Sequence, residues 1–371
     1  MRILWFNWRD LKHPDAGGAE IYTQEIMTRL VKRGHQVTLF TSQVRGQPEN
    51  ERIERDIDII RRGGKFSLYR EAKQFCKSRQ SEYDLIIDEI NVRPFINPAI
   101  SKGKPLLAVF HQLIREEWFY ETRFPINYIC YYLLENRWLS PHRNTPTITV
   151  SNSSMQDLRQ LGFTRIYVVH NGLSVSPLIK LNVKEIRPTL VFIGRLKKHK
   201  LPDHALKAFF LVREKISDAQ MWIIGDGDMK ARLESSNPKN VTIFGRVPDK
   251  QKFDLLSRAH LVLMPSVREG WGLVVTESNA MGTPVVGYNV AGLRDSIVHL
   301  QTGILSEANT PTRLASHAIA LLRDKTTLHK YSEAALYHSH QFSWDKSADK
   351  FDQIIENIVA SSPINLAVKP H

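Results

Sequence analysis

The stretch Met264–Glu277, with the sequence MPSVREGWGLVVTE, decides the fold of the second half of this chain. It starts at the end of an apolar run, Leu261–Met264, which is typical of a buried strand. A turn with Gly270 and Gly272 follows, and the pattern predicts a helix that begins near Leu273. Such a turn exposes backbone N–H groups beside a helix N-terminus, which favours the binding of an anion.

Two carboxylates, Glu269 and Glu277, border this turn. They would repel a phosphate, whereas an ionised carboxylate accepts strong hydrogen bonds from hydroxyl groups. We therefore expect sugar or ribose hydroxyls as their partners. The alternative interpretation, a glutamate on either side of an ordinary helix cap, stays open on this motif alone.

The strand–turn–helix unit recurs along the chain. Helical spacing of apolar residues is found at Ala19–Arg33 and Pro202–Val212, and residues 174–187 are less periodic and indicate a linker. The expected strands are Met1–Phe6, Gln36–Thr41, Asp84–Asp88, Pro105–Phe110, Thr147–Val150, Ile166–His170, Thr189–Ile193, Gln220–Ile224, Asn240–Phe244, Leu261–Met264 and Pro284–Tyr288. This order predicts an α/β protein with two doubly wound parallel sheets, whose ligands bind at the carboxyl ends of the strands.

A basic loop follows the strand that ends at Ile193. It contains Arg195, Lys197, Lys198 and Lys200. Cations near the carboxyl end of a strand suit a diphosphate, and they would stabilise the negative charge that develops on a nucleotide leaving group. A solvated basic loop without a ligand is the alternative.

The first half offers two weaker candidates. Gly17 and Gly18 precede a helix, where glycines let the backbone approach a phosphate, although a simple turn explains them equally well. His111 follows an expected strand and could contact a sugar hydroxyl, although a lone histidine is more often structural.

No metal site is expected. Asp226-Gly-Asp228 resembles the D-x-D pattern of some sugar transferases, but Asp228 is predicted to be a helix N-cap. Two cysteines make no metal-ligand spacing and suggest the reduced thiols of a cytosolic protein. The N-terminus does not read as a signal peptide, and no apolar run reaches about 18 residues, so we expect a cytoplasmic protein.

The charge is +13 with a pI of about 9.6, and it is spread over both halves. Such a charge favours anionic partners, namely phosphates, nucleic acid or an acidic lipid surface. Residues 116–138 are rich in aromatics and could form an acceptor-recognition surface, a patch against lipid headgroups at the inner membrane face, or a core helix. No nucleic-acid motif is found, so nucleic acid is not expected as a partner.

Together these motifs resemble the family-4 glycosyltransferases, which have the GT-B fold. Glu269 and Glu277 match the paired-glutamate motif of that family, which also contains Gly270, Trp271, Gly272 and Leu273. Gly194-Arg195-Leu196 with Lys200 resembles its donor-diphosphate loop, although a glycine usually stands where this chain has Leu201. Further matches are Gly17-Gly18 beside the phosphates, His111 near the reacting sugar, and Gly245, Arg246 and Val247 at the nucleobase pocket.

The resemblance implies two Rossmann-like domains facing a central cleft, with an acceptor-side domain at 1–175, a donor-side domain at 186–342 and a helix at 343–361 returning to the first. It implies transfer of a hexose-type sugar from a nucleotide-diphosphate sugar to a glycan, lipid-linked or small-molecule acceptor. The anomeric configuration would be retained, without a metal or another cofactor. Glu277 would bind the ribose and Glu269 the donor sugar. A sugar-nucleotide epimerase or hydrolase of the same fold, and a non-enzymatic binder of anionic lipid or nucleic acid, remain alternatives.

Overall fold

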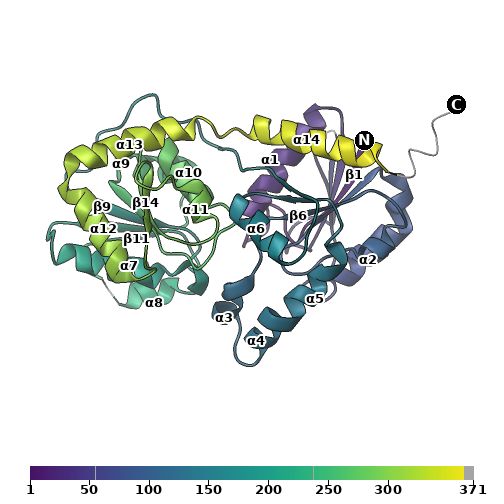
Figure 1. The fold of residues 1–371 in the computed structure, drawn as a ribbon, viewed down its shortest axis with the longest axis horizontal. Coiled ribbons are helices and arrows are strands. Elements are labelled where there is room, and N and C mark those ends of the chain that lie inside the picture. The colour runs from purple at the N-terminus through teal and green to yellow at the C-terminus, as the bar shows by residue number, and fades with distance from the viewer. Residues whose placement is uncertain (55, 237, 363–371) are drawn as a thin grey trace. The chain divides into compact units, whose positions relative to one another are not determined.

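The structure is a computed structural model that describes residues 1–54, 56–236 and 238–362. The chain forms two compact units (Figure 1). Of the described residues, the first contains Met1–Arg115, Tyr128–Gly172 and Ser343–Ser362, and the second contains Glu116–Asn127 and Leu173–Phe342. Each unit is an α/β structure built on one sheet.

The sheet of the first unit has the strand order β3-β4-β2-β1-β5-β6-β7-β8. Its strands are parallel except β3, which runs antiparallel to β4. The chain order reverses between β1 and β5, so the loops that follow these two strands leave the sheet at a topological switch point. The strands are β1 (Arg2–Phe6), β2 (Gln36–Thr41), β3 (Asn50–Glu54), β4 (Ile57–Arg61), β5 (Leu85–Glu89), β6 (Leu106–Phe110), β7 (Thr147–Thr149) and β8 (Ile166–Val168).

Helices cover both faces of this sheet. α2 packs its buried Phe75 against Phe40 on one face, whereas Phe351 of α14 stacks on Trp5 on the other, with 5.4 Å between ring centroids. The helices are α1 (Gly18–Lys32), α2 (Leu68–Arg79), α5 (Glu135–Leu139), α6 (Asn152–Gln160) and α14 (Trp344–Ala360). A short helix, α4 (Ile126–Ile129), contributes its last two residues to this unit, and a π-helical turn, η4 (Cys130–Leu134), joins α4 to α5.

The C-terminal helix α14 lies alongside α1 (Figure 1). Arg29 on α1 pairs with Asp345 at 2.7 Å, and His35, just after α1, pairs with Asp352 at 2.8 Å. Arg33 adds an ion pair to Asp349 between these two. The last helix therefore completes the unit that the first residues of the chain begin.

The sheet of the second unit has the order β11-β10-β9-β12-β13-β14, and neighbouring strands are parallel. This corresponds to the strand order 3-2-1-4-5-6 of a Rossmann sheet, whose switch point lies between the first and fourth strands, here β9 and β12. The strands are β9 (Thr189–Ile193), β10 (Gln220–Ile224), β11 (Val241–Gly245), β12 (Leu261–Met264), β13 (Val285–Tyr288) and β14 (Gly303–Ser306).

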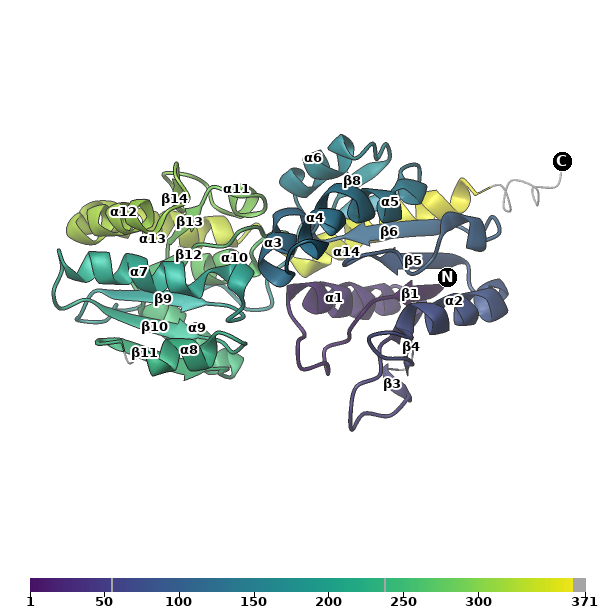
Figure 2. The ribbon, with the colours of Figure 1, turned by 90° about the horizontal axis from the view of Figure 1, so that it is seen from below.

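Alternate residues of each strand enter two separate cores of this unit. Phe192 packs with α7 and α12 on one face, whereas Val191 and Ile193 pack with α9 and α10 on the other. Figure 2 shows α7 beside β9 in this unit. The helices are α3 (Trp118–Glu121), α7 (Pro202–Arg213), α8 (Lys230–Ser235), α9 (Asp249–Arg258), α10 (Leu273–Ala280), α11 (Leu293–Ser296), α12 (Pro311–Arg323) and α13 (Lys325–Ser339).

The two parallel-sheet domains confirm the predicted fold class. Elements that were not predicted from the sequence include the strands β3, β4 and β14 and the helices α2, α9, α12 and α13. β3 is an edge strand with the sequence NERIE, and such charged edges lack the apolar run that marks a central strand. None of the helices in the described part of the chain combines the length and apolar character needed to cross a membrane.

Candidate functional site

The switch point of the second sheet gathers the strongest sequence candidates. Arg195 and Lys200 follow β9, whereas Glu269 and Glu277 follow β12, which pairs directly with β9. Because the strands are parallel, both loops emerge at the same edge of the sheet. The predicted basic loop and the paired glutamates therefore belong to one site.

The loop after β9 has a constrained backbone. A Cβ atom on Gly225 would lie 1.9 Å from the carbonyl oxygen of Gly194, so this close approach requires a residue without a side chain. Leu201 adopts the left-handed conformation, with φ of 51°, at the N-cap of α7. This conformation favours glycine, so the turn before α7 places its strain on a leucine.

Lys200 and Glu269 form a close ion pair in this site. Lys200 Nζ lies 2.7 Å from Glu269 Oε1, and Ser266 Oγ donates a hydrogen bond of 2.6 Å to the same oxygen. Burial by itself would raise the pKa of Glu269, but Lys200 and Ser266 outweigh it and hold that pKa below its usual value. Glu269 is thus kept ionised.

Glu277 pairs with a lysine that the sequence analysis did not single out. Lys252 Nζ, on α9, lies 3.0 Å from Glu277 Oε1 and 2.9 Å from Asp249 Oδ1. Burial raises the pKa of Glu277 above its usual value even though Lys252 opposes the shift, and Asp249 adds to it. No local motif marks Lys252, because it reaches the site through the packing of α9 against α10.

The remaining motif residues shape the turn before α10. Gly272, the N-cap of α10, has a φ of 83°, which suits a glycine. Trp271 is buried, 4% exposed, and its ring meets Phe342 edge-on at 5.5 Å between centroids. Gly270 and Leu273 are half-buried at the two sides of this turn.

The predicted nucleobase segment begins at Gly245, the last residue of β11. Gly245 is buried with a φ of 69°, Val247 is half-buried against the α9–α10 core, and Arg246 is exposed. Lys230 Nζ lies 3.1 Å from where a Cβ atom of Gly245 would stand. A side chain at position 245 would therefore have to displace a cation, a feature that the sequence did not reveal.

The predicted glycine loop lies at the N-terminus of α1, in the first unit. Gly17 is the N-cap and Gly18 the first helical residue, and the Gly17 backbone N–H donates a 2.7 Å hydrogen bond to Glu20 Oε2. A carboxylate of the chain itself already satisfies this N–H group. An anion bound here would share the helix N-terminus with Glu20.

His111 follows β6, where it contacts a buried carboxylate that the sequence analysis did not single out. His111 Nε2 lies 2.9 Å from Glu89 Oε1, and Glu89 is fully buried at the end of β5. Glu89 Oε2 also accepts hydrogen bonds from Trp5 Nε1 at 2.8 Å and Thr23 Oγ1 at 2.6 Å. The position of His111 is therefore fixed by β1, β5 and α1 together.

The prediction that Asp228 caps a helix is wrong. α8 begins at Lys230 with Met229 as its N-cap, and the Asp228 carboxylate pairs instead with Lys197 Nζ at 2.7 Å. The glycine-rich turn at Gly225 and Gly227 shifts the start of the helix by one residue, because the N-cap is Met229 instead of Asp228. Among the described residues, no group of three or more His, Cys, Asp or Glu side chains is placed to hold a metal ion.

The aromatic segment 116–138 is not the core helix that one interpretation predicted. Its exposed apolar side chains include Phe124, 78% exposed, and Leu133, 64% exposed, although Leu139 just after it is buried. Within the second unit, Glu121 of α3 lies 2.6 Å from His199 Nδ1, next to Lys200 in sequence. Segment and basic loop are therefore in contact.

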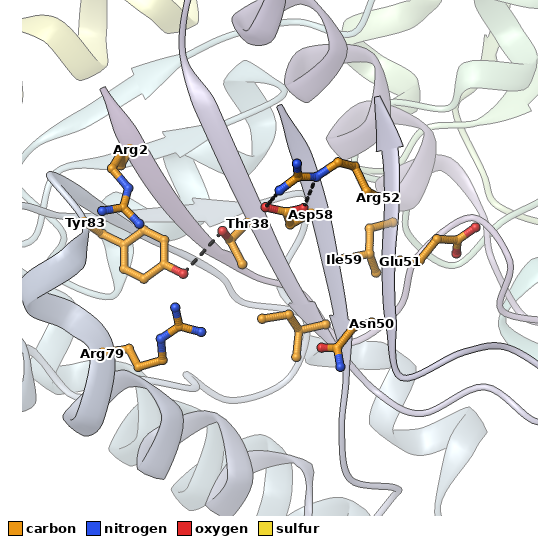
Figure 3. A pocket seen from close by; sticks show the side chains of 10 residues that line it. Arg2, Thr38, Asn50, Glu51, Arg52, Asp58, Ile59, Arg79 and Tyr83 are labelled. Carbon is orange, nitrogen blue, oxygen red and sulfur yellow. Dashed lines mark hydrogen bonds and ion pairs between the residues drawn. The ribbon is translucent and has the colours of Figure 1, made fainter. Parts of the chain in front are cut away.

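A separate hollow of about 350 Å³ lies on the first unit and contains none of the predicted site residues (Figure 3). Arg2, Arg52 and Arg79 line it, together with Thr38 and Tyr83. The Arg52 guanidinium pairs with Asp58 at 2.6 Å, and that of Arg79 pairs with Glu82 at 2.6 Å, so their charges are already compensated.

Two family models match this chain. One is described as Glycosyltransferase Family 4 and matches residues 16–176, and the other, Glycosyl transferases group 1, matches residues 179–338. The chain belongs to the family-4 glycosyltransferases. The second match contains both switch-point loops of the second sheet, after β9 and after β12.

Curated relatives of this family-4 chain include two enzymes of similar sequence. A D-inositol 3-phosphate glycosyltransferase from Corynebacterium diphtheriae is 31% identical over 44% of this chain and 41% of the relative. An N-acetyl-alpha-D-glucosaminyl L-malate synthase from Bacillus anthracis is 30% identical over 48% of this chain and 47% of the relative. The matched segments thus span less than half the length of either relative.

Solved structures show the GT-B fold for this family-4 chain. A sucrose-phosphate synthase from Thermosynechococcus elongatus has a TM-score of 0.77 at 19% identity and covers 97% of this chain and 100% of its own. The Anabaena protein HepE in complex with UDP and glucose has a TM-score of 0.68 at 18% identity and covers 96% and 100%. At this identity the likeness concerns the fold alone.

Proposed function

We propose that this protein is a retaining glycosyltransferase that moves a hexose-type sugar from a nucleotide-diphosphate sugar to an acceptor. The observation that carries the proposal is the meeting of two charged loops at the β9–β12 switch point, where Lys200 of one loop pairs with Glu269 of the other. Cations there suit a diphosphate, and buried carboxylates suit the hydroxyls of sugar and ribose. A relative of this fold was crystallised with UDP and glucose.

In the proposed reaction the bond between the anomeric carbon and the diphosphate breaks, and a bond to the acceptor oxygen forms on the same face. The acceptor proton passes to the departing phosphate, so no nucleophile from the protein is needed. Arg195 and Lys200 stabilise the charge that develops on the leaving group. Because these cations supply positive charge, we propose that the reaction requires no metal and no other cofactor.

For the first unit we propose the roles that the family resemblance implies. His111, which Glu89 holds through Nε2, contacts the sugar near its reacting carbon. The N-terminus of α1 at Gly17 and Gly18 assists with the phosphates, and Gly245, Arg246 and Val247 line the nucleobase pocket.

Nucleotide binding provides the direct test. A thermal-shift screen against nucleotides and nucleotide sugars identifies the donor, since a bound ligand stabilises the folded state. We expect Glu277→Gln to weaken nucleotide affinity in calorimetry by roughly 10- to 100-fold, because charged hydrogen bonds to ribose are lost. The matched control is Glu333→Gln on α13, which changes an exposed glutamate. Unchanged affinity in Glu277→Gln would contradict the proposal.

The acceptor is proposed to be a glycan, a lipid-linked molecule or a small metabolite. The names of two relatives contain inositol 3-phosphate and malate, both anionic, and this chain carries a net charge of +13. Transfer assays with an acceptor panel should include an arm without acceptor. Epimer or free sugar formed in that arm, with no transfer in the others, would favour the epimerase or hydrolase instead.

We also propose peripheral contact with an anionic membrane surface. Tyr128, Tyr132 and Leu133 of α4 and η4 are 50%, 63% and 64% exposed, and aromatic side chains of this kind favour the headgroup region of a bilayer. Sedimentation with anionic vesicles should fall when Tyr132 and Leu133 are both changed to Ser. Equal sedimentation with neutral and anionic vesicles would contradict a role for charge.

A further inference from the structure

The lysine that pairs with Glu277 is held in place from several directions. Lys252 Nζ lies 3.0 Å from Glu277 Oε1 and 2.9 Å from Asp249 Oδ1, and its side chain is only 16% exposed. The same ammonium group lies 4.3 Å from the ring centroid of Phe253, within the range of a cation–π interaction. These contacts hold the Lys252 ammonium group in one position, so it does not move freely in solvent.

Glu277 needs such a partner because it is buried. Its side chain is 11% exposed, and a carboxyl group removed from water favours the neutral form. A neutral carboxyl has one acceptor oxygen fewer and carries a proton of its own, so it binds hydroxyl groups less well. Among the described residues, the charged groups that shift the pKa of Glu277 are Lys252, which lowers it, and Asp249, which raises it.

We infer that Lys252 is a positioning residue of the nucleotide site, which holds the Glu277 carboxylate ionised and oriented through Oε1 for the ribose hydroxyls. The inference rests on the proposed function, in which Glu277 binds the ribose. Lys252 acts through Glu277, not through a contact of its own with the nucleotide. A lysine that contacted phosphate directly would stay important after Glu277 is neutralised.

A double-mutant cycle separates these two roles. Calorimetry measures the affinity of the wild-type protein, Lys252→Met, Glu277→Gln and the double variant for UDP, GDP or ADP, whichever the wild type binds. We expect Lys252→Met to weaken binding by roughly tenfold near pH 6 and much less near pH 8.5, because loss of Lys252 raises the pKa of Glu277 further and a lower pH favours the protonated form. In the Glu277→Gln background, the same change should alter affinity by less than about twofold.

Two controls accompany the cycle. Lys207→Met on α7 removes a lysine that lies 3.8 Å from Asp203 and is 66% exposed, and we expect no change in nucleotide affinity. Lys252→Arg keeps the positive charge and should retain most of the affinity near pH 6. If thermal unfolding shows that Lys252→Met does not fold, Lys252→Arg and Lys252→Gln are used instead to compare nucleotide affinity with and without the positive charge.

The outcomes are distinguishable. An equal loss of affinity in the wild-type and Glu277→Gln backgrounds would overturn the inference, because Lys252 would then contact the nucleotide itself. Full affinity of Lys252→Met at every pH, with Glu277→Gln still impaired, would overturn the inference and leave the proposed function standing. A wild-type protein that binds none of the nucleotides would overturn both.

Discussion

Glu269 and Glu277 belong to the same motif, and each is paired with a lysine, yet burial has opposite outcomes for the two. Glu269 receives a second donor, Ser266 Oγ, beside Lys200, and its pKa lies below the usual value. Glu277 shares its lysine with Asp249, and its pKa lies above the usual value. One motif therefore provides a carboxylate that is firmly ionised and another whose charge depends on its neighbours.

The largest expected effect is at Lys200. In Lys200→Met, the diphosphate loses a cation and the buried Glu269 loses its counter-charge, so we expect kcat for sugar transfer to fall by roughly 10²- to 10³-fold. Steady-state kinetics with the donor found by thermal shift measure this. If Lys200→Met raised KM and left kcat unchanged, Lys200 would stabilise the ground state and the transition state equally.

The next effect concerns the stability of the fold. We expect replacement of Glu269 and replacement of Glu277 by glutamine to change this stability in opposite directions. The pKa of Glu269 is lower in the folded chain, so its ionised form stabilises the fold above pH 4.5 and this contribution is lost as pH falls further. Glu269→Gln should therefore destabilise the protein at neutral pH by about 1–3 kcal/mol, leaving Lys200 unpaired.

Glu277→Gln should behave in the opposite way. The pKa of Glu277 is raised on folding, so the folded chain favours the protonated form, and stability falls as pH rises from 4.5 through the raised value. Neutralising this group removes that cost at neutral pH, and we expect an unchanged or higher Tm. Denaturant unfolding of both variants at neutral pH tests this comparison. If both substitutions destabilised the protein, or both stabilised it, the comparison would be contradicted.

A smaller effect concerns the turn that places Lys200. At Leu201, where φ is 51°, glycine should be about 1 kcal/mol more stable than alanine. At Leu206, inside α7, the order should be reversed by about the same amount. Urea unfolding of Leu201→Gly, Leu201→Ala, Leu206→Gly and Leu206→Ala measures both differences. If the alanine variant were more stable than the glycine variant at both positions, the turn at Leu201 would be free of strain.

The smallest effect is expected at an exposed lysine–acid pair. Asp228, 78% exposed in its side chain, pairs with Lys197, and such surface pairs contribute little. Asp228→Asn should change transfer activity by less than about twofold. Addition of a chelator such as EDTA should leave activity unchanged as well. A strong loss in either experiment would restore the metal-binding interpretation of Asp226-Gly-Asp228.

Most of the fold and half of the charged site could be predicted from the sequence. Apolar runs such as Thr189–Ile193 and Leu261–Met264 identify central strands, because a buried parallel strand is apolar on both faces. Lys200 and Glu269 were expected in one site, but not as partners of each other. Their pairing depends on β9 and β12 being neighbours, which the order of elements along the chain does not reveal.

The residues that the sequence analysis missed depend on tertiary packing. Lys252 lies in an ordinary amphipathic helix, and Glu89 ends a strand without any motif around it. Both become significant only when another element, α10 or the end of β6, lies beside them. The error at Asp228 has a local and a distant cause. Its Gly-Asp pattern is typical of an N-cap, whereas Lys197, with which it pairs, is 31 residues away in the sequence.

The packing of α14 against β1 and α1 has a consequence for folding during synthesis of the chain. The rings of Trp5 and Tyr22 contact Phe351 and Trp344, which are among the last described residues to leave the ribosome. During synthesis, these aromatic side chains of β1 and α1 therefore stay without their α14 partners until the second unit has been translated. Nascent chains halted before Ser343 should therefore expose these side chains to protease and to chaperones, whereas the second unit has all its own elements by then.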